Sequence, residues 1–488
     1  MTPRQPRRIL FVCHAYLPDS HAGVEVYTAR LASGLQATGR WEVAVLTARK
    51  RPGRAQNSVE CGEVDGIRTY ELVQNYPYRD LPEAVDDPAQ DRVFSEIIAA
   101  FDPELVSIQT LAGLSVGFLD RCQAAQVPTV LHLHDGWWSC PSGGQRWRSE
   151  TGPCLPIDRR LCSSCFADYR HLEGPLERGA RALATRLPGP LPAHSLHHAF
   201  QRLPQPAKRL LRELNEKGAR LRFGRPGRQE QTSSTDSKPD LMPAIMARHH
   251  RVRSALNGID QVIAPSRFIA ESLQADGLEL PKLCIEPTGV PLPTASIARR
   301  RDSNIKLLFA GTWVPHKGPQ VFARALAAMD PLHFEAGQLS ARALGPKPFA
   351  AFAKEVLELA SGRLEDKGVL APTEMAAALS SADALIIPSL WAENAPLVVM
   401  EALAVGTPVI ASRIGGLPEL IAEGRDGLLF GPGDHRELAD LLSQLSSHPS
   451  QLDELSSSLQ PPRDLVAFCA AIEGRYLRLC SQQQRASA

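Results

Sequence analysis

The segment 384–430 reads ALIIPSLWAENAPLVVMEALAVGTPVIASRIGGLPELIAEGRDGLLF, and it carries a pair of glutamates between two apolar runs. The first apolar run is short enough for a buried parallel strand. Pro396 fits the first turn of a following helix, where a missing N–H costs nothing. Glu393 then precedes this helix and Glu401 lies on it, so both carboxylates can face one opening at the carboxyl end of a parallel sheet.

A second strand is expected at Thr407–Ala411, and it leads into Gly415-Gly416. Because glycine has no side chain, the amides of this turn could approach an anion closely. With P-S-L-W before the glutamates and G-G-L-P-E after the strand, the segment resembles the donor-site signature of glycosyltransferase family 4. The resemblance implies a retaining enzyme of the GT-B fold class, which is α/β with two Rossmann-like domains facing across a cleft.

The resemblance also implies roles for individual residues. It assigns Glu393 to the hydroxyls of a donor sugar and Glu401 to the ribose of its nucleotide. The helix start is expected to present free N–H groups to the diphosphate, because helix N-termini bind anions. The donor-binding residues predicted in this segment are Glu393, Asn394, Ala395, Leu397 and Glu401.

Transfer from a nucleotide-diphosphate sugar requires positive charge at the leaving diphosphate. The chain has no Asp-x-Asp sequence to hold a metal there, so no cofactor is expected in catalysis. The stretch 309–318, FAGTWVPHKG, resembles the family's F-V-G-R-x-x-x-x-K-G phosphate clamp, with Lys317 as the clamp lysine and Gly311 as the close-approach glycine. Thr312 stands where the family has arginine, which removes a cation and a bidentate donor. Arg267, Arg413 and His316 are the candidate replacements.

The first half of the chain offers two further site candidates. Ala22-Gly23 resembles the Gly-rich turn that follows the first strand of the family, and Gly23 is predicted to bind the donor. His134-Asp135 resembles the family's acceptor-side pair, whereas His14 and His132 are expected to be structural. The predicted catalytic residues are His134, Asp135, Lys317 and Glu393. The resemblance favours retention through same-face attack, with the leaving phosphate taking the acceptor proton; Asp135 is the alternative as a covalent nucleophile.

Four cysteines, Cys140, Cys154, Cys162 and Cys165, follow this pair, and the last two form a C-x-x-C. Such a spacing can chelate one tetrahedral metal, and a subset of the family carries a similar Cys-rich loop. A structural zinc site is the favoured interpretation. Unligated thiols and an iron–sulfur cluster are the alternatives.

Length and pattern predict the domain organisation. The 488 residues, 43% of them hydrophobic and 22% charged, can bury large cores. Strands and helices alternate through both halves, which indicates parallel sheets. The predicted parts are an N-terminal acceptor-side domain at 1–284, a linker at 285–304, a C-terminal donor domain at 305–460 and a helical tail at 461–488. The first domain includes the Cys-rich loop at 140–165 and a basic insertion at 170–253.

The composition bears on location and partners. A net charge of +1 gives no reason to expect nucleic acid. The apolar run near the start is too short for a signal peptide, and ten cysteines without such a signal indicate the reducing cytoplasm. The basic insertion, with a helical stretch at Ala207–Phe223, is interpreted either as a surface for anionic lipid or an acidic acceptor, or as a passive solvated insertion. The expected location is therefore cytoplasmic, with peripheral contact at the inner membrane face.

The predicted function is transfer of a sugar from a nucleotide-diphosphate sugar to a glycan or lipid-linked glycan. Two alternatives stay open. A sugar-nucleotide epimerase of the same fold would need no acceptor site. A catalytically lapsed sugar-nucleotide binding protein is favoured by Thr312 and Ala22, but intact Lys317, Glu393 and Glu401 argue against it.

Overall fold

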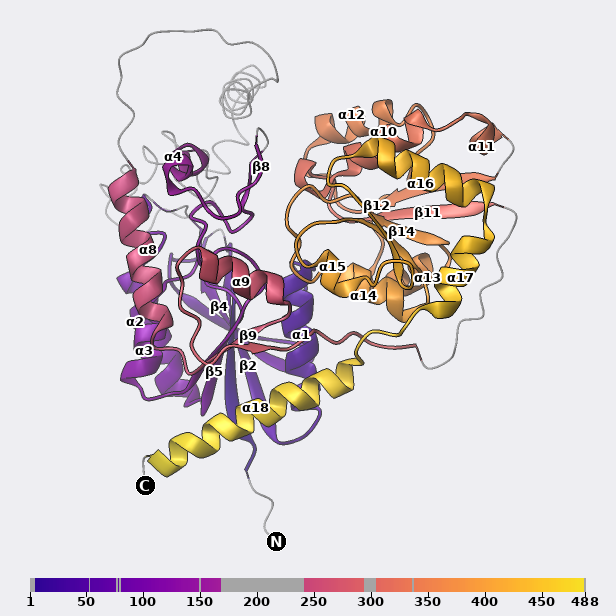
Figure 1. Ribbon diagram of the computed structural model, residues 1–488. Coiled ribbons are helices and arrows are strands. Elements are labelled where there is room, and N and C mark those ends of the chain that lie inside the picture. The colour runs from indigo at the N-terminus through magenta and orange to yellow at the C-terminus, as the bar shows by residue number, and fades with distance from the viewer. Residues whose placement is uncertain are drawn as a thin grey trace, which may run out of the picture.

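The computed structural model describes residues 5–51, 53–75, 78, 80–148, 151–167, 241–293, 304–335 and 338–486. These residues form two α/β domains, each with its own sheet, and a long last helix that runs back under the first domain (Figure 1). This arrangement confirms the predicted fold class. The helical stretch predicted at 207–223 and most of the linker, 294–303, lie outside the described residues.

The first domain contains an eight-stranded sheet with the order β10-β9-β6-β5-β1-β2-β4-β3. Its strands are β1 (Arg7–Cys13), β2 (Trp41–Arg49), β3 (Val59–Val64), β4 (Ile67–Val73), β5 (Leu105–Ile108), β6 (Thr129–His132), β9 (Gln261–Ala264) and β10 (Cys284–Ile285). Along β1, Leu10 and Val12 face one hydrophobic core while Ile9 and Phe11 face the other. A strand buried on both faces reads as a continuous apolar run, as the central strand of a parallel sheet does.

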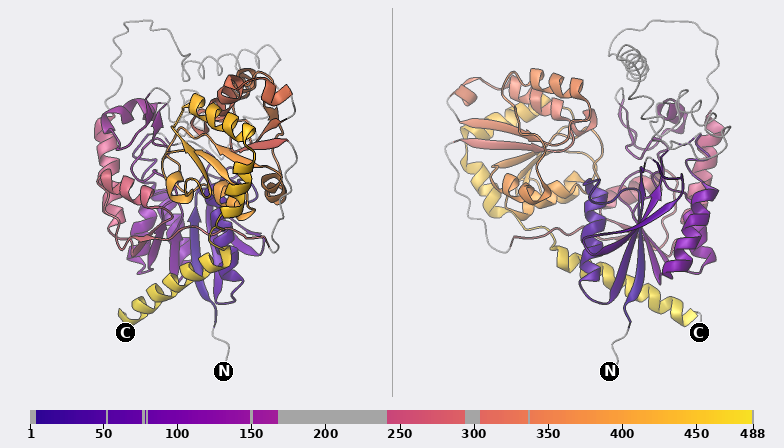
Figure 2. Two further views of the ribbon diagram at one scale, coloured as in Figure 1. Left: turned by 45° about the vertical axis from the view of Figure 1, so that its right-hand side comes forward. Right: turned by 180° about the vertical axis from the view of Figure 1, so that it is seen from behind.

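Helices cover both faces of this sheet (Figure 2). They are α1 (Gly23–Gln36), α2 (Pro88–Phe101), α3 (Gly117–Ala124), α8 (Met242–Leu256) and α9 (Arg267–Ala275). The end of the predicted basic insertion, 242–253, belongs to α8, where Ile245 and Val252 are buried in the core. Apolar residues at helical spacing therefore fold this part of the segment into the domain despite its positive charge.

The β3–β4 hairpin was not predicted. Its strands are antiparallel, unlike the other pairs in the sheet, and a two-residue turn joins them. Asp65 and Gly66 form this turn with φ values of 51° and 77°. Asp-Gly is the preferred sequence for such a turn because both positions need positive φ, so the signal was present in the sequence.

The second domain has a six-stranded parallel sheet with the order β13-β12-β11-β14-β15-β16. Its strands are β11 (Ile305–Ala310), β12 (Leu339–Leu344), β13 (Glu365–Asp366), β14 (Ala384–Ile387), β15 (Val409–Ser412) and β16 (Gly427–Phe430). Its helices are α10 (Pro319–Ala328), α11 (Leu332–Glu335), α12 (Ala350–Leu359), α13 (Pro372–Ser380), α14 (Leu397–Ala404), α15 (Leu417–Leu420), α16 (His435–Ser447) and α17 (Ser450–Ser458), with a short 3₁₀ turn, η1, at Pro315–Lys317.

The last helix, α18 (Leu465–Ala486), packs against α1 and the sheet of the first domain. Phe468, Ile472 and Tyr476 are fully or almost fully buried there, and each such side chain contributes roughly 1.5–3 kcal/mol. Glu473 accepts a hydrogen bond from the indole of Trp41 at 2.9 Å. The segment predicted as a C-terminal helical tail is thus built into the core of the first domain.

A small Cys-rich subdomain lies on the first domain beside α8 (Figure 1). It contains the hairpin β7 (Trp147–Arg148) with β8 (Gly152–Pro153), and the helix α4 (Arg159–Ala167). Arg146 anchors it, because its guanidinium lies 2.8 Å from the buried carboxylate of Asp276 at the end of α9. Among the helices of the described residues, none is long and apolar enough to cross a membrane.

Candidate functional site

The predicted donor-site segments follow three neighbouring strands of the second sheet. The loop 311–318 follows β11, the turn 388–396 follows β14, and Gly415-Gly416 follow β15. Because these strands are parallel and adjacent, their carboxyl ends meet at one edge of the sheet, which is where open α/β sheets bind ligands.

Lys317 and Glu393 form a direct ion pair across two of these loops. Lys317 Nζ lies 2.7 Å from Glu393 Oε1 and 4.8 Å from the ring centre of Trp391. The hydroxyl of Ser389 donates to the same carboxylate at 2.8 Å. Burial raises the pKa of Glu393, but Lys317 and the hydrogen bonds from Trp391 and Ser389 outweigh it, so that the pKa is lowered overall. The site therefore holds an ionised carboxylate beside a fixed cation.

The glycines around this pair permit close backbone packing. Gly318 has a φ of 75°, and a Cβ there would lie 1.8 Å from the carbonyl oxygen of Pro388. A Cβ on Gly415 or Gly416 would clash with the backbone of 393–394. Gly416 N donates to Glu393 O at 2.6 Å. The amide of Gly416, which we expected to face an anion, is instead used to hold the Glu393 turn.

Gly311 and Gly23 are different, because neither is packed tightly. A Cβ on Gly311 would touch only the Phe309 ring, at 3.5 Å, and one on Gly23 would have no atom within 4 Å. Gly23 is the first residue of α1, and Ala22 is its N-cap without a side-chain hydrogen bond. The described protein atoms therefore give no steric reason for glycine at either position.

The three candidates to replace the clamp arginine lie in different surroundings. Arg413 pairs with Glu423 at 2.6 Å on the surface, and Arg267 has an exposed side chain at the start of α9. His316 shares the η1 turn with Lys317, and its ring lies 5.1 Å from that of Trp391. Thr312 is partly exposed in the same loop. Of the three, His316 alone shares the loop of Lys317.

Glu401 and the start of α14 lie next along the chain. Pro396 is the N-cap of α14, so the helix begins one residue later than expected, at Leu397. Ala395 and Leu397 are partly exposed. Glu401 Oε1 accepts from Arg30 Nη2 of α1 at 2.6 Å, and both side chains are about three-quarters buried, with exposed fractions of 22% and 25%. The predicted ribose-binding carboxylate is thus paired with the first domain.

His134 lies just beyond the end of β6, at the face of the first domain. Its Nε2 is 3.0 Å from Gln109 Oε1, and its ring packs edge-on against Tyr27 at 4.5 Å. Burial, with the nearby His14, lowers the pKa of His134 to about 3, so the ring is neutral near neutral pH. His132 is buried between the hydroxyls of Tyr27 and Tyr476, each 2.8 Å from a ring nitrogen.

Asp135, the second member of the pair, has a local structural contact. Its Oδ1 accepts from the amide of Trp137 at 2.8 Å. Burial raises the pKa of Asp135, although the Trp137 amide and His14 oppose that rise. The carboxylate therefore stabilises the turn that leads into the Cys-rich subdomain.

Asn394 joins the two candidate regions. Its amide Nδ2 donates to the carbonyls of Leu133 and His134, both at 3.1 Å, and its Oδ1 accepts from Ser266 Oγ at 2.6 Å. The Glu393 turn and the end of β6 are therefore in contact. Asn394, predicted to bind the donor, here uses its side chain to connect the domains.

Two tryptophans belong to the site although the sequence did not single them out. The ring centre of Trp147 of β7 lies 5.8 Å from that of His316, and the ring centre of Trp391 lies 5.1 Å from it. The indole nitrogen of Trp147 is buried without a hydrogen-bond partner among the described residues, whereas a side-chain hydrogen bond from Trp391 helps to lower the pKa of Glu393. Trp391 stands inside the P-S-L-W sequence and could have been noticed, whereas nothing in the chain spacing connects Trp147 with His316.

The four cysteines gather in the Cys-rich subdomain. Burial, together with the nearness of Cys140, Cys154 and Cys165, raises the pKa of the Cys162 thiol to about 12. Arg148 donates to Cys165 Sγ at 3.0 Å. The thiols are therefore neighbours, yet no three Cys, His, Asp or Glu side chains in the described part of the chain have the arrangement of a metal site. The donor set suits zinc, but the geometry does not fit it.

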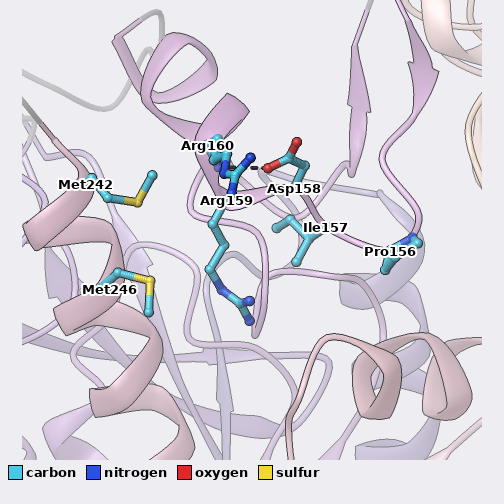
Figure 3. Close-up of a pocket in the computed structure, with 7 residues that line it drawn as sticks. All are labelled: Pro156, Ile157, Asp158, Arg159, Arg160, Met242 and Met246. Carbon is cyan, nitrogen blue, oxygen red and sulfur yellow. Dashed lines mark hydrogen bonds between the residues drawn. The ribbon is translucent and has the colours of Figure 1, made fainter.

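A cavity of about 580 Å³ lies elsewhere, between the Cys-rich subdomain and α8 (Figure 3). Arg159, Arg160, Met242 and Met246 are among its lining residues. None of the residues that line it was predicted as a site residue, so this cavity is separate from the Lys317–Glu393 pair.

Two family models match the chain, one on each domain. A model described as "Glycosyl transferase 4-like domain" matches residues 22–171, and one described as "Glycosyl transferases group 1" matches residues 304–448. The first match contains His134-Asp135 and the four cysteines, and the second contains Lys317, Glu393 and Glu401.

Curated proteins with similar sequences include D-inositol 3-phosphate glycosyltransferase of Corynebacterium efficiens, 37% identical over 189 residues, which are 36% of this chain and 39% of that protein. The MMP alpha-(1->4)-mannosyltransferase of Mycolicibacterium hassiacum is 30% identical over 203 residues, 41% of this chain and 48% of that protein. The chain thus spans about two-fifths to a half of the length of these relatives.

Solved structures share the fold over nearly the whole chain. Sucrose-phosphate synthase from Thermosynechococcus elongatus has a TM-score of 0.63 and 17% identity, covering 98% of this chain and 100% of that one. Anabaena HepE in complex with UDP and glucose has a TM-score of 0.58 and 16% identity, covering 96% and 98%.

Proposed function

Since the chain belongs to glycosyltransferase family 4, we propose that it is a retaining glycosyltransferase that moves a sugar from a nucleoside-diphosphate sugar to a glycan or lipid-linked glycan. The observation that carries the proposal is the ion pair between Lys317 and Glu393, at 2.7 Å, on a sheet edge typical of ligand sites. It offers a cation for the leaving diphosphate and an ionised acceptor for sugar hydroxyls.

Each of the four candidate site residues has its own role in the proposed transfer. Lys317 stabilises the charge that develops on the diphosphate as the glycosidic bond breaks. Glu393 accepts hydrogen bonds from the donor sugar, and Glu401 from the ribose. His134, on the facing domain, lies beside the reacting sugar and the acceptor.

Retention proceeds through same-face attack. The acceptor oxygen forms a bond to the anomeric carbon while the bond from that carbon to the phosphate oxygen breaks. The acceptor proton passes to the leaving phosphate. Because Asp135 is held by the amide of Trp137, its involvement in a turn favours this route over a covalent intermediate on Asp135.

Catalysis is proposed to need no metal, because the chain lacks Asp-x-Asp and positions Lys317 instead. Transfer should persist through a brief exposure to EDTA. A rapid loss of activity that Mg²⁺ restores would contradict this part of the proposal.

A thermal-shift screen against UDP-, GDP- and ADP-sugars tests the donor class. UDP-glucose is the first probe, since UDP and glucose are bound in the HepE structure. A ligand at about 100 times its dissociation constant stabilises a protein by roughly 2.7 kcal/mol. Glu393→Gln should lose the shift, and the surface variant Glu423→Gln should keep it. No shift with any nucleotide sugar would refute the proposal.

Two outcomes of that screen would replace transfer with another function. Conversion of a bound nucleotide sugar to an isomer without any acceptor would indicate an epimerase. Binding without turnover in the presence of a broad set of glycan acceptors would indicate a lapsed binding protein.

The location is proposed to be cytoplasmic, with peripheral membrane contact through the basic insertion. Most of that segment, 170–240, lies outside the described residues, so the support is its excess of lysine and arginine over acidic residues. Binding to vesicles should require anionic lipid and weaken with salt. Equal binding to neutral vesicles, or no binding, would return the segment to a passive insertion.

A further inference from the structure

A continuous chain of hydrogen bonds runs through the interior of the first domain from its last helix to His134. Tyr476 OH of α18 lies 2.8 Å from Ser107 Oγ of β5. The amide Nε2 of Gln109 donates to the same Ser107 oxygen at 2.9 Å, and Gln109 Oε1 lies 3.0 Å from His134 Nε2. Three successive contacts therefore join a residue near the end of the described chain to the face that meets the donor domain.

The donor and acceptor roles in these hydrogen bonds determine which ring nitrogen of His134 carries the proton. Because the amide group of Gln109 is used as a donor to Ser107, its oxygen is left to accept, and His134 must supply the proton on Nε2. A neutral ring with Nε2–H has an unprotonated Nδ1. Within the described residues the imidazole of His134 makes no other hydrogen bond, so Nδ1 remains available to accept one from a ligand.

The other groups near His134 do not compete for this role. The Tyr27 ring packs edge-on at 4.5 Å and its hydroxyl bonds to His132, whose ring lies 6.3 Å away. His14 lies 3.4 Å from the buried Glu25. Asp135 accepts from its own turn. Gln109 is therefore the group that holds the imidazole of His134 by a hydrogen bond.

Tyr476, at the other end of this series of hydrogen bonds, is also held in place by several contacts. Tyr476 is fully buried, and its hydroxyl also meets His132 Nε2 at 2.8 Å. Glu473, about one turn earlier on α18, accepts from Trp41 and pairs with Arg40. These contacts dock the helix without the Tyr476 hydroxyl, so removing that hydroxyl should interrupt the chain and leave the helix in place.

We propose that Tyr476 is a positioning residue for His134: through Ser107 and Gln109, the last helix holds the imidazole in its Nε2–H form and turns Nδ1 toward a substrate hydroxyl. The last clause rests on the proposed function. Buried hydrogen bonds polarise one another, and a partly satisfied network loses its unique arrangement. A break at Tyr476 or Ser107 should therefore loosen the Gln109 amide and release His134 to exchange between its two neutral forms.

The test reads the ring directly. The full chain is made with isotopically labelled histidine, and a two-bond proton–nitrogen correlation spectrum reports which ring nitrogen carries the proton. The His134 signals are assigned by their loss in His134→Gln. In the unaltered protein we expect one protonated and one unprotonated nitrogen near neutral pH.

Tyr476→Phe should make the two nitrogen shifts of His134 converge, and Ser107→Ala should do the same from the middle of the chain. Glu473→Gln is the matched control. It alters a buried polar contact of α18 that is not part of the hydrogen-bond series from Tyr476 to His134, so the nitrogen shifts of His134 should not change. If Tyr476→Phe does not fold, Ser107→Ala carries the test.

Unchanged His134 signals in the folded variants among Tyr476→Phe and Ser107→Ala would overturn the proposal. So would an equal change in Glu473→Gln, since that would mean helix docking alone acts on His134. UDP binding, measured by calorimetry, should stay within about twofold in Tyr476→Phe, because donor contacts are untouched. If neither the variants nor the wild-type protein binds UDP, UDP is excluded as the nucleotide of the donor, while the ring measurement still decides the positioning role.

Discussion

Arg30 and Glu401 belong to different domains and are separated by 371 positions in the chain, yet Arg30 Nη2 lies 2.6 Å from Glu401 Oε1. The other terminal nitrogen of Arg30 is buried without a partner among the described residues. The carboxylate proposed to bind the ribose thus already has a bound cation. A nucleotide must either displace Arg30 or share Glu401 with it.

We expect Arg30→Met to tighten UDP binding, because the ribose would no longer compete with a guanidinium. Partly exposed pairs are typically worth about 0.2–1 kcal/mol, so the gain should not exceed about fivefold. Isothermal titration calorimetry with UDP measures it. Glu401→Gln should weaken binding. Weaker binding by Arg30→Met would instead make Arg30 part of the nucleotide site.

Lys317→Ala should reduce turnover of the donor by about 10²–10³, comparable with the loss of one charge-stabilising group. Lys347→Ala is the control, because Lys347 packs over Trp313 at 5.2 Å in the same domain and pairs with Asp366. Initial rates with a nucleotide sugar measure both variants. Turnover by Lys317→Ala within threefold of wild type would remove Lys317 from the mechanism.

Glu393 should also give the fold a pH dependence. Its pKa is lowered from the usual value of 4.5, so the unfolded chain binds this proton more readily than the folded one. The stability from its ionised form is complete above about pH 4.5 and is lost as the pH falls through the lowered pKa. Denaturant unfolding of wild type and Glu393→Gln should show a stability difference that is constant above that pH and changes below it.

The imidazole of His134 should also make the fold less stable in acid, but here because its positively charged form is disfavoured in the folded protein. Its pKa falls from 6.5 to about 3 on folding. Between these values the unfolded state takes up the proton and the folded state does not, so acid lowers stability across that window. His134→Gln should therefore lose less stability than wild type between about pH 6 and pH 4. If the stability of wild type and that of His134→Gln change with pH in parallel, folding does not lower the pKa of His134.

The cysteine cluster leads to a measurement of metal content. The spacing of Cys140, Cys154, Cys162 and Cys165 predicts about one zinc per chain, although no three of them have metal-site geometry in this structure. Because the thiols in this structure do not have that arrangement, we expect elemental analysis of anaerobically purified protein to find no stoichiometric metal. About one zinc per chain, lowered in Cys162→Ser, would instead bear out the spacing. Protein without metal would establish free thiols, and brown protein with iron would indicate a cluster.

Local sequence was sufficient to predict the secondary structure around the donor site. The segment around Glu393 and Glu401 encodes strand, turn and helix within a short span. The strand β14 has nearly the expected bounds, and α14 begins one residue after the expected start at Pro396. The Asp65-Gly66 hairpin carried an equally local signal that was overlooked. In each case neighbouring residues determine the conformation, because turn and helix-start geometry depends on the backbone itself.

The contacts between distant segments could not be predicted in the same way. Trp147 lies near His316, Arg30 pairs with Glu401, and Tyr476 hydrogen-bonds to Ser107, although the two residues of each pair are far apart in the chain. Such pairs depend on three-dimensional packing and leave no spacing pattern in one sequence. The use of Gly416 is a further example, because its amide could serve either an anion or the Glu393 carbonyl, and only the fold decides.

The return of α18 to the first domain bears on the order in which the protein can be made. Tyr27, Trp41 and Val130 share one core with Phe468 and Ile472, so residues 7–285 emerge from the ribosome with that surface uncovered. Domains usually fold as units in the order of synthesis. Here the core of the first domain is completed only when residues 465–486 follow the whole of the second domain, and until then the apolar face that α18 covers stays exposed.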